Sequence, residues 1–157
     1  MDNSCLPVRT IPKEEAVFWL DKNGYWRNRH GKFRTPKIIA HFHSSIQKDE
    51  HGYYLVQDHP EFREKVYFPH EDTALFVFDV QENGQDLILK LNTGQEVPLP
   101  PDKLFIHSDH LYMDLDGERV KFSERALVSV SRFMQFDAEQ DKAWIAYQGR
   151  SWPVPFV

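Results

Sequence analysis

The side chains of this sequence that could do acid–base or metal chemistry are eight histidines and two close pairs of acidic residues. A zinc site needs several converging ligands. His41 and His43 are two residues apart in a predicted helix, where this spacing points side chains in different directions. His107 and His110 bracket a predicted turn, and the sequence offers no further ligand for them. We therefore expect no metal site, and a His-Glu-x-x-His motif is absent.

The acidic pairs are Asp49-Glu50 and Asp114-Leu-Asp116. Carboxylates that share acid–base work flank a substrate, whereas Asp49 and Glu50 are adjacent in a predicted turn, which favours solvated charge. The second pair is like the start of a calcium loop, but the twelfth position of that loop is Arg125 rather than glutamate. The nucleophile elbow, the phosphate-binding loop and the dinucleotide glycine motif are absent too. We therefore expect a protein that is not an enzyme and carries no cofactor.

The stretch from Phe42 to Val56 organises the predicted fold. It has the pattern of a helix end, a charged turn and an aromatic-rich strand. Thr35-Pro36 is typical of a helix start, and Lys48–Gly52 is predicted to end that helix, with glycine suited to a positive φ. The apolar face of the helix consists of Ile38, Ile39, Phe42 and Ile46.

A similar order of elements is predicted a second time. Two strands over residues 104–113 precede a helix capped by Ser123, as two strands over residues 17–27 precede the first helix. The second helix has an apolar face that matches the first at a constant spacing: Ala126, Leu127, Val130, Phe133 and Met134. A diverged duplication explains the match, and two unrelated units fit the patterns equally well.

Short runs of β-forming residues between turns fill the middle of the chain and predict an antiparallel meander. The predicted fold class is therefore α+β, with two related strand-strand-helix-strand lobes and antiparallel sheets. Residues 1–16 are expected to form an N-terminal arm, residues 17–99 the first lobe with the meander, and residues 100–157 the second lobe. Pro100-Pro101 marks the expected boundary.

Ser45 interrupts the apolar face of the first helix, where the second helix has Phe133. A serine at such a position either opens onto a cleft or donates its hydroxyl to the carbonyl four residues earlier, as helical serines readily do. The sequence leaves both interpretations open.

Charge and composition exclude several classes of function. The net charge is −5, and the basic residues are sparse even in their densest stretch, Arg27–Lys37, so duplex nucleic acid is not an expected partner. Cys5 is the single cysteine, which excludes an internal disulfide. No run approaches the ~18 apolar residues that span a membrane, and no signal peptide is recognised, so we expect a cytoplasmic protein without membrane contact.

Several motifs resemble an uncharacterised bacterial family, a domain of unknown function. They are Gly24-Tyr-Trp26, Pro36, Phe42-x-Ser-Ser-Ile46, Lys48-Asp-Glu-x-Gly-Tyr-Tyr-Leu-Val56 and Glu71-Asp-x-Ala-x-Phe76. The resemblance covers residues 18–80 well. It implies a duplicated α+β core, a C-terminal lobe superficially like a pleckstrin-homology fold, a nucleotide-like ligand between the lobes and a role in bacterial signalling. Where the family has an arginine followed shortly by Phe-Tyr on the second helix, this chain has Arg132-Phe-Met-Gln-Phe136.

The resemblance and the residue pattern together give a candidate ligand site. Hydroxyls and cations at the end of the first helix would hold a phosphate, and the tyrosines after it would stack on a base. The set is Ser44, Ser45, Lys48, Tyr53, Tyr54 and Arg132, the last if the repeats pack face to face. We therefore expect a non-enzymatic small-ligand-binding protein with a nucleotide-like ligand. The alternative is a protein-interaction module that presents a sheet edge or a lobe groove to a protein partner.

Overall fold

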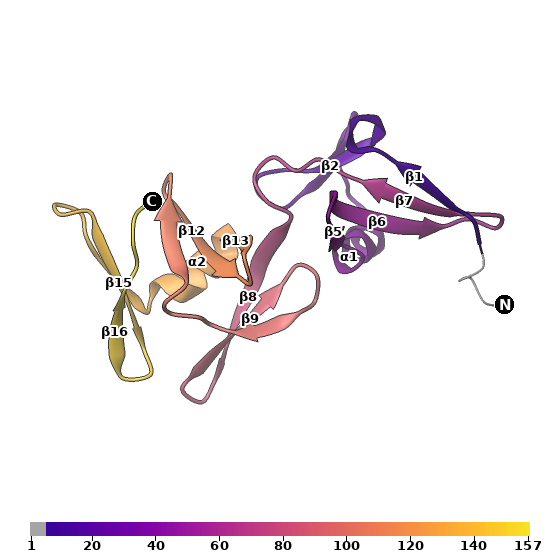
Figure 1. Ribbon diagram of the computed structural model, residues 1–157. Helices are drawn as coiled ribbons and strands as arrows, with labels where there is room; N and C mark the ends of the chain where they lie inside the picture. The colour runs from indigo at the N-terminus through magenta and orange to yellow at the C-terminus, as the bar shows by residue number, and fades with distance from the viewer. Residues whose placement is uncertain (1–5) are drawn as a thin grey trace. The chain divides into compact units, whose positions relative to one another are not determined.

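The protein divides into two compact units, Met1–Ala74 and Leu75–Val157. The structure is a computed structural model that describes residues 6–157. Each unit combines mainly antiparallel sheets with one α-helix (Figure 1), so the class is α+β with strands predominating. The division lies after Ala74 rather than at Pro100-Pro101, because the meander strands hydrogen-bond with strands of the C-terminal part of the chain.

The described part of the first unit has two sheets and one α-helix. The three-stranded sheet has the order β2 (Phe18–Leu20), β3 (Trp26–Asn28), β4 (Gly31–Lys32). The four-stranded sheet has the order β1 (Val8–Ile11), β7 (Arg63–Tyr67), β6 (Gly52–Asp58), β5 (Gln47–Asp49). The helix α1 spans Pro36–Ser44, and a short 3₁₀ turn, η2, spans Lys13–Glu15.

The predicted N-terminal arm contributes a strand to this unit. β1 pairs in parallel with β7, with Val8 opposite Arg63 and Ile11 opposite Val66. Residues 1–5 of the predicted arm lie outside the described residues. Residues 8–11 are therefore part of the four-stranded sheet and not of an arm, because backbone hydrogen bonds join them to β7.

Helix α1 begins as the sequence predicts and ends earlier. Pro36 occupies its first turn, although the Thr35 side chain makes no capping hydrogen bond. The helix ends at Ser44, and Gln47–Asp49 forms strand β5 instead of the expected last helical turn. The reason is tertiary: β5 pairs with β6, with Lys48 opposite Tyr53, and this ladder satisfies the backbone groups that a longer helix would have used.

An aromatic cluster forms the core of the first unit. Trp26 is 1% exposed, and its ring lies edge-on to those of Phe42 (5.3 Å) and Phe68 (4.9 Å). Phe18 packs edge-on against both Trp26 and Phe42. Such edge-to-face pairs stabilise beyond the area that they bury.

The second unit also has two sheets and one helix. The six-stranded sheet has the order β10 (Glu96–Pro98), β9 (Asp86–Leu91), β8 (Leu75–Asn83), β13 (Glu118–Phe122), β12 (His110–Leu115), β11 (Leu104–His107). The three-stranded sheet has the order β14 (Met134–Asp137), β15 (Lys142–Tyr147), β16 (Arg150–Pro153). Helix α2 spans Glu124–Ser131 and follows β13.

Helix α2 confirms the predicted N-cap. The Ser123 hydroxyl accepts a hydrogen bond from the Ala126 amide at 3.2 Å. Ala126 and Val130 are buried against an aliphatic core. Phe133 and Met134, predicted for the same helix face, lie beyond the helix, which ends at Ser131.

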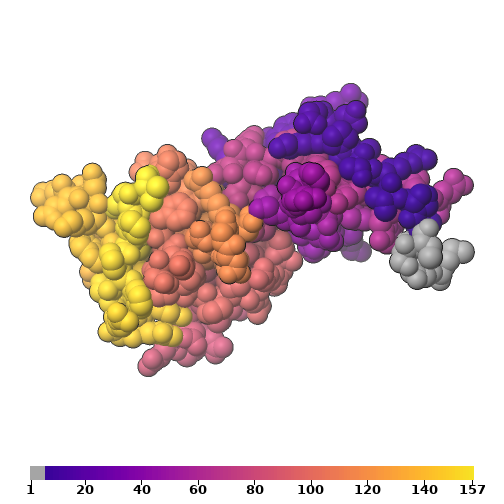
Figure 2. All heavy atoms as spheres, viewed as in Figure 1, coloured from indigo at the N-terminus to yellow at the C-terminus, as the bar shows by residue number. Residues whose placement is uncertain are grey.

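The two units share one order of elements. A three-stranded antiparallel meander, a helix and a second three-stranded meander follow one another as β2–β4, α1, β5–β7 and as β11–β13, α2, β14–β16. In the space-filling view, the C-terminal meander lies on the surface of the second unit (Figure 2).

Candidate functional site

The two predicted serines lie at the end of α1, and both hydroxyls are used by the helix itself. Ser45 donates to the carbonyl of His41 at 2.6 Å, and Ser44 donates to the same carbonyl at 3.1 Å. Of the two interpretations of Ser45, the structure therefore shows the local hydrogen bond, which is the usual habit of a serine near a helix end.

The two predicted tyrosines point to opposite faces of the β5–β6 hairpin. Adjacent residues of a strand alternate in direction, and Lys48 pairs with Tyr53 whereas Gln47 pairs with Tyr54. Leu55 and Val66 are buried on the face that carries Tyr53, so Tyr54 lies on the outer face. The structure thus places Lys48 with Tyr53 and separates both from Tyr54.

Arg132 belongs to the second unit. It is the C-cap residue of α2, its guanidinium forms an ion pair with Glu82 at 2.8 Å, and it lies 4.9 Å from the Phe133 ring centroid. The six predicted residues are therefore distributed over both units; within the first unit the two serines share the His41 carbonyl, and Lys48 lies beside Tyr53.

Lys48 and Tyr53 join a histidine that the sequence analysis did not assign. The Lys48 ammonium lies 5.2 Å from the Tyr53 ring centroid, and His70 meets that ring edge-on at 5.7 Å. Burial lowers the pKa of His70, the charges of Lys13 and Lys48 lower it further, and the neighbouring Asp72 acts in the opposite direction. We call Lys13, Lys48, Tyr53 and His70 the cationic cluster.

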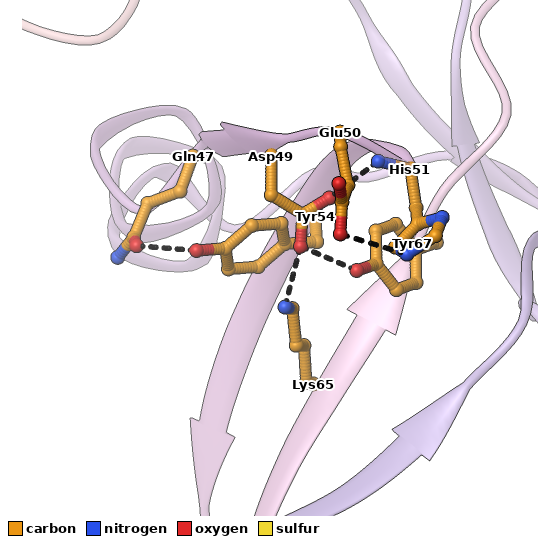
Figure 3. A network of polar contacts seen from close by, with 7 residues as sticks. All are labelled: Gln47, Asp49, Glu50, His51, Tyr54, Lys65 and Tyr67. Carbon is orange, nitrogen blue, oxygen red and sulfur yellow. Dashed lines mark hydrogen bonds and ion pairs between the residues drawn. The ribbon is translucent and has the colours of Figure 1, made fainter.

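A polar network covers the outer face of the same sheet (Figure 3). Asp49 accepts hydrogen bonds from the Lys65 ammonium at 2.6 Å and from the Tyr67 hydroxyl at 2.5 Å. The Tyr54 hydroxyl donates to Gln47 at 3.0 Å, and the Lys65 ammonium lies 4.2 Å from the Tyr54 ring centroid. Tyr54 is thus engaged in this network.

These contacts fix the charges of the network. Hydrogen bonds from Lys65 and Tyr67 hold the pKa of Asp49 well below its usual range. The hydrogen bond to Asp49 raises the pKa of Lys65 and that of Tyr67. Asp49 was predicted to be a solvated turn carboxylate, and the structure instead gives it three donors, the third being the His51 amide at 2.9 Å. A network satisfied in this way has a structural role.

The first unit also contains a pocket of about 460 Å³ beside its aromatic core. Three phenylalanine rings line it: Phe18, Phe33 and Phe42. Phe33 and Phe18 each meet Phe42 edge-on, at 5.2 and 5.1 Å between ring centroids. We call this cavity the phenylalanine pocket.

The polar part of the phenylalanine pocket consists of two carboxylates and two amides. They are Glu15, Glu64, Asn28 and Gln57, from η2, β7, β3 and β6. Sequence reasoning missed all four, because they come from four separate elements and no motif links them. Phe42 was assigned to the apolar face of the helix, and only the tertiary fold turns it toward a cavity.

The second unit has an apolar groove of about 600 Å³ at its C-terminal meander. Trp144, Trp152 and Phe156 line it together with neighbouring prolines. Phe156 is 47% exposed.

Residues 6–157 contain neither a metal-ligand cluster nor a membrane-spanning helix. Among these residues no three histidine, cysteine, aspartate or glutamate side chains converge as metal ligands. The same part of the chain contains no helix with the length and apolar character to cross a membrane.

Comparisons with known proteins bear on the fold. No family model and no curated protein matches the sequence. A crystal structure of a DUF1285 family protein from Silicibacter pomeroyi DSS-3 matches with a TM-score of 0.62 and 13% identity, over 98% of this chain and 86% of the other. A DUF1285 family protein from Shewanella baltica OS155 matches with a TM-score of 0.47 and 18% identity, over 71% of this chain and 87% of the other. The structural neighbours of this chain are thus bacterial proteins of an uncharacterised family, and the first of them shows the shared fold.

Proposed function

We propose that the protein is a non-enzymatic small-ligand-binding protein whose ligand occupies the phenylalanine pocket. The observation that carries this proposal is the pocket itself, with three aromatic rings and four polar side chains around about 460 Å³. Small-molecule sites are typically cavities of about 300–1,000 Å³ with mostly apolar walls and a few polar groups.

A nucleotide-like ligand is proposed for a separate location, the cationic cluster, none of whose residues lines the phenylalanine pocket. The Lys48 ammonium lies 5.2 Å from the Tyr53 ring centroid, and Lys13 contributes a second positive charge near His70, whose own lowered pKa favours the neutral imidazole. Cations beside an aromatic ring suit a phosphate attached to a base. The cluster retains Lys48 and Tyr53 from the set predicted by sequence.

The evolutionary and cellular parts of the proposal come from the order of elements and from sequence motifs. The shared order of elements supports a duplication, and the motifs from Gly24-Tyr-Trp26 to Glu71-Asp-x-Ala-x-Phe76 support membership of the resembled family. From that resemblance we propose a pleckstrin-homology-like C-terminal unit and a role in cytoplasmic bacterial signalling.

A second candidate function is protein interaction through the second unit. The apolar groove lined by Trp144, Trp152 and Phe156 favours it. Aromatic residues are enriched where protein surfaces bind peptides or partner proteins.

A ligand screen with pocket variants tests the first proposal. The screen measures thermal stability with nucleotides, cyclic mono- and dinucleotides, and nicotinamide and flavin cofactors. A ligand at about 100 times its Kd adds about 2.7 kcal/mol, which raises the Tm by roughly 5–10 °C for this length.

Two exposed valines provide a matched pair of variants. Val17 lines the pocket and is 78% exposed, so Val17→Trp should occlude the pocket without disturbing the core. Val8 is 58% exposed on β1 and does not line it, so Val8→Trp is the control. We expect a shift lost in Val17→Trp and kept in Val8→Trp.

A third variant, Ser45→Phe, distinguishes ligand binding in the phenylalanine pocket from ligand binding at the end of α1. A shift lost in Ser45→Phe and kept in Val17→Trp would place the ligand at the end of α1. A shift kept in both would contradict both placements. No shift with any compound would favour protein interaction through the groove.

A further inference from the structure

We propose that the phenylalanine pocket selects a cationic ligand with an apolar body, an organic amine. This inference rests on the proposed function, because it names the ligand class of the same pocket.

The charge of the lining is negative. Glu15 and Glu64 both line the pocket, and among the described residues its wall contains no lysine or arginine. A cavity lined by charges of one sign raises the local concentration of the opposite ion and disfavours a ligand of its own sign. A phosphate inside this pocket would face two carboxylates.

Two basic residues are neighbours of Glu64, and neither donates a hydrogen bond to its carboxylate. His59 Nε2 lies 3.8 Å from the Glu64 carboxylate, which is beyond hydrogen-bonding distance and neutralises it only when the imidazole is protonated. Arg9 pairs with Glu64 in the β1–β7 ladder, but its guanidinium lies over the Phe62 ring at 4.1 Å from the centroid.

The aromatic wall also favours a cation. Phe18 and Phe33 meet Phe42 at interplanar angles of 64° and 68°, so the three rings present surfaces in several directions. A cation within about 6 Å of an aromatic face is attracted by the ring quadrupole, and quaternary ammonium groups are recognised by such cages.

The amides complete a set of acceptors for an ammonium group. The Gln57 and Asn28 side chains line the pocket, and the Asn28 carbonyl oxygen accepts from the His30 amide at 2.9 Å. An amide oxygen has two lone pairs, so it accepts a second hydrogen bond. Carboxylates, aromatic faces and amide oxygens all attract an N–H cation that carries an apolar body.

Three probes of one size and different charge test this selection. They are phenethylamine (cation), 2-phenylethanol (neutral) and phenylacetate (anion), each titrated into the full chain up to about 10 mM, a range that detects weak ligands. Backbone amide NMR shifts of the residues that line the pocket report binding there. We expect phenethylamine to bind about tenfold more tightly than 2-phenylethanol, and phenylacetate to bind most weakly.

Variants of the two pocket carboxylates test whether they cause the preference for a cation. Glu64→Gln and Glu15→Gln should each weaken phenethylamine about three- to tenfold and leave 2-phenylethanol unchanged, because only the charged probe loses an attraction. Glu61→Gln is the matched control, since Glu61 is an exposed carboxylate near β7 that does not line the pocket.

The outcomes separate the cation inference from the proposed ligand site. Equal affinity for the three probes at the pocket overturns the cation inference and supports the proposed ligand site. Tighter phenethylamine binding that Glu61→Gln weakens as much as Glu64→Gln also overturns the inference, because the effect is then general charge. No pocket shift with any probe, together with an empty nucleotide and cofactor screen, overturns both proposals.

Discussion

The two units follow the same order of elements and fill their cores with different residue types. The first unit packs Trp26 among Phe18, Phe42 and Phe68. The second unit packs mainly aliphatic side chains, with Met113 and Ile145 fully buried. Edge-to-face ring pairs stabilise beyond the area that they bury, so the first core depends on a few large rings and the second on many smaller side chains.

The outer faces of the meanders that follow the two helices, β5–β7 and β14–β16, differ as well. In each, a glutamine is opposite an aromatic residue: Gln47 faces Tyr54 in one, and Gln135 faces Trp144 in the other. The next strand then places Tyr67 beside Tyr54 but Pro153 beside Trp144. A tyrosine can join a hydrogen-bonded network around Asp49, and a proline side chain cannot, so the second face retains an apolar groove.

The largest expected effect tests the contrast between the cores. Trp26→Leu should lower the free energy of unfolding by about 3 kcal/mol, because it removes several edge-to-face contacts and leaves a cavity. Met113→Leu in the second unit should cost less than about 1.5 kcal/mol, because the volume is conserved. Urea unfolding followed by circular dichroism measures both. Equal costs would show that the aromatic core is no more demanding than the aliphatic one.

The next effect is a pH dependence of the aromatic core. His43 is 5% exposed and its Nδ1 accepts a hydrogen bond from the Trp26 indole at 3.2 Å. Burial lowers the pKa of His43 from 6.5 to about 4. Between these values the unfolded chain binds a proton that the folded protein does not, so stability falls with pH below 6.5. The loss should reach about 3 kcal/mol near pH 4.

His43→Gln should remove this part of the acid destabilisation and keep an acceptor for the indole. His41→Gln is the control, because His41 is exposed on the same helix. The measurement is urea unfolding as a function of pH. A pH slope that is identical in His43→Gln and in the unmodified protein would contradict the prediction.

The smallest effect concerns the outer face, where solvent screens the charges. Asp49 and Lys65 are 27% and 26% exposed. Because the folded pKa of Asp49 lies below its usual value, its contribution is present above about pH 4 and is lost as the pH falls further. Asp49→Asn should lower the Tm at neutral pH and have less effect in strong acid. Glu50→Gln, at an 85% exposed neighbour, should change neither, and a matching loss in that variant would assign the effect to general surface charge.

The sequence predicted local features where neighbouring residues decide the outcome. The α+β class, the Pro36 and Ser123 helix starts and most strand–turn–strand units follow from short-range patterns. It misplaced the end of α1, because Gln47, Lys48 and Asp49 have no strong strand propensity and extend only by pairing with β6. It also predicted Asp49 as a solvated charge, because Lys65 and Tyr67 are distant in sequence.

The sequence by itself thus determined where both helices begin and where most hairpins turn, since caps, turns and periodicity act over a few residues. The tertiary structure alone decided which side chains meet. Pairing of β5 with β6 placed Lys48 beside Tyr53, and the Tyr53 ring in turn meets His70. The packing of η2, β3, β6 and β7 gathered Glu15, Asn28, Gln57 and Glu64 around three phenylalanine rings. These contacts depend on long-range pairing, which no short stretch of the chain encodes.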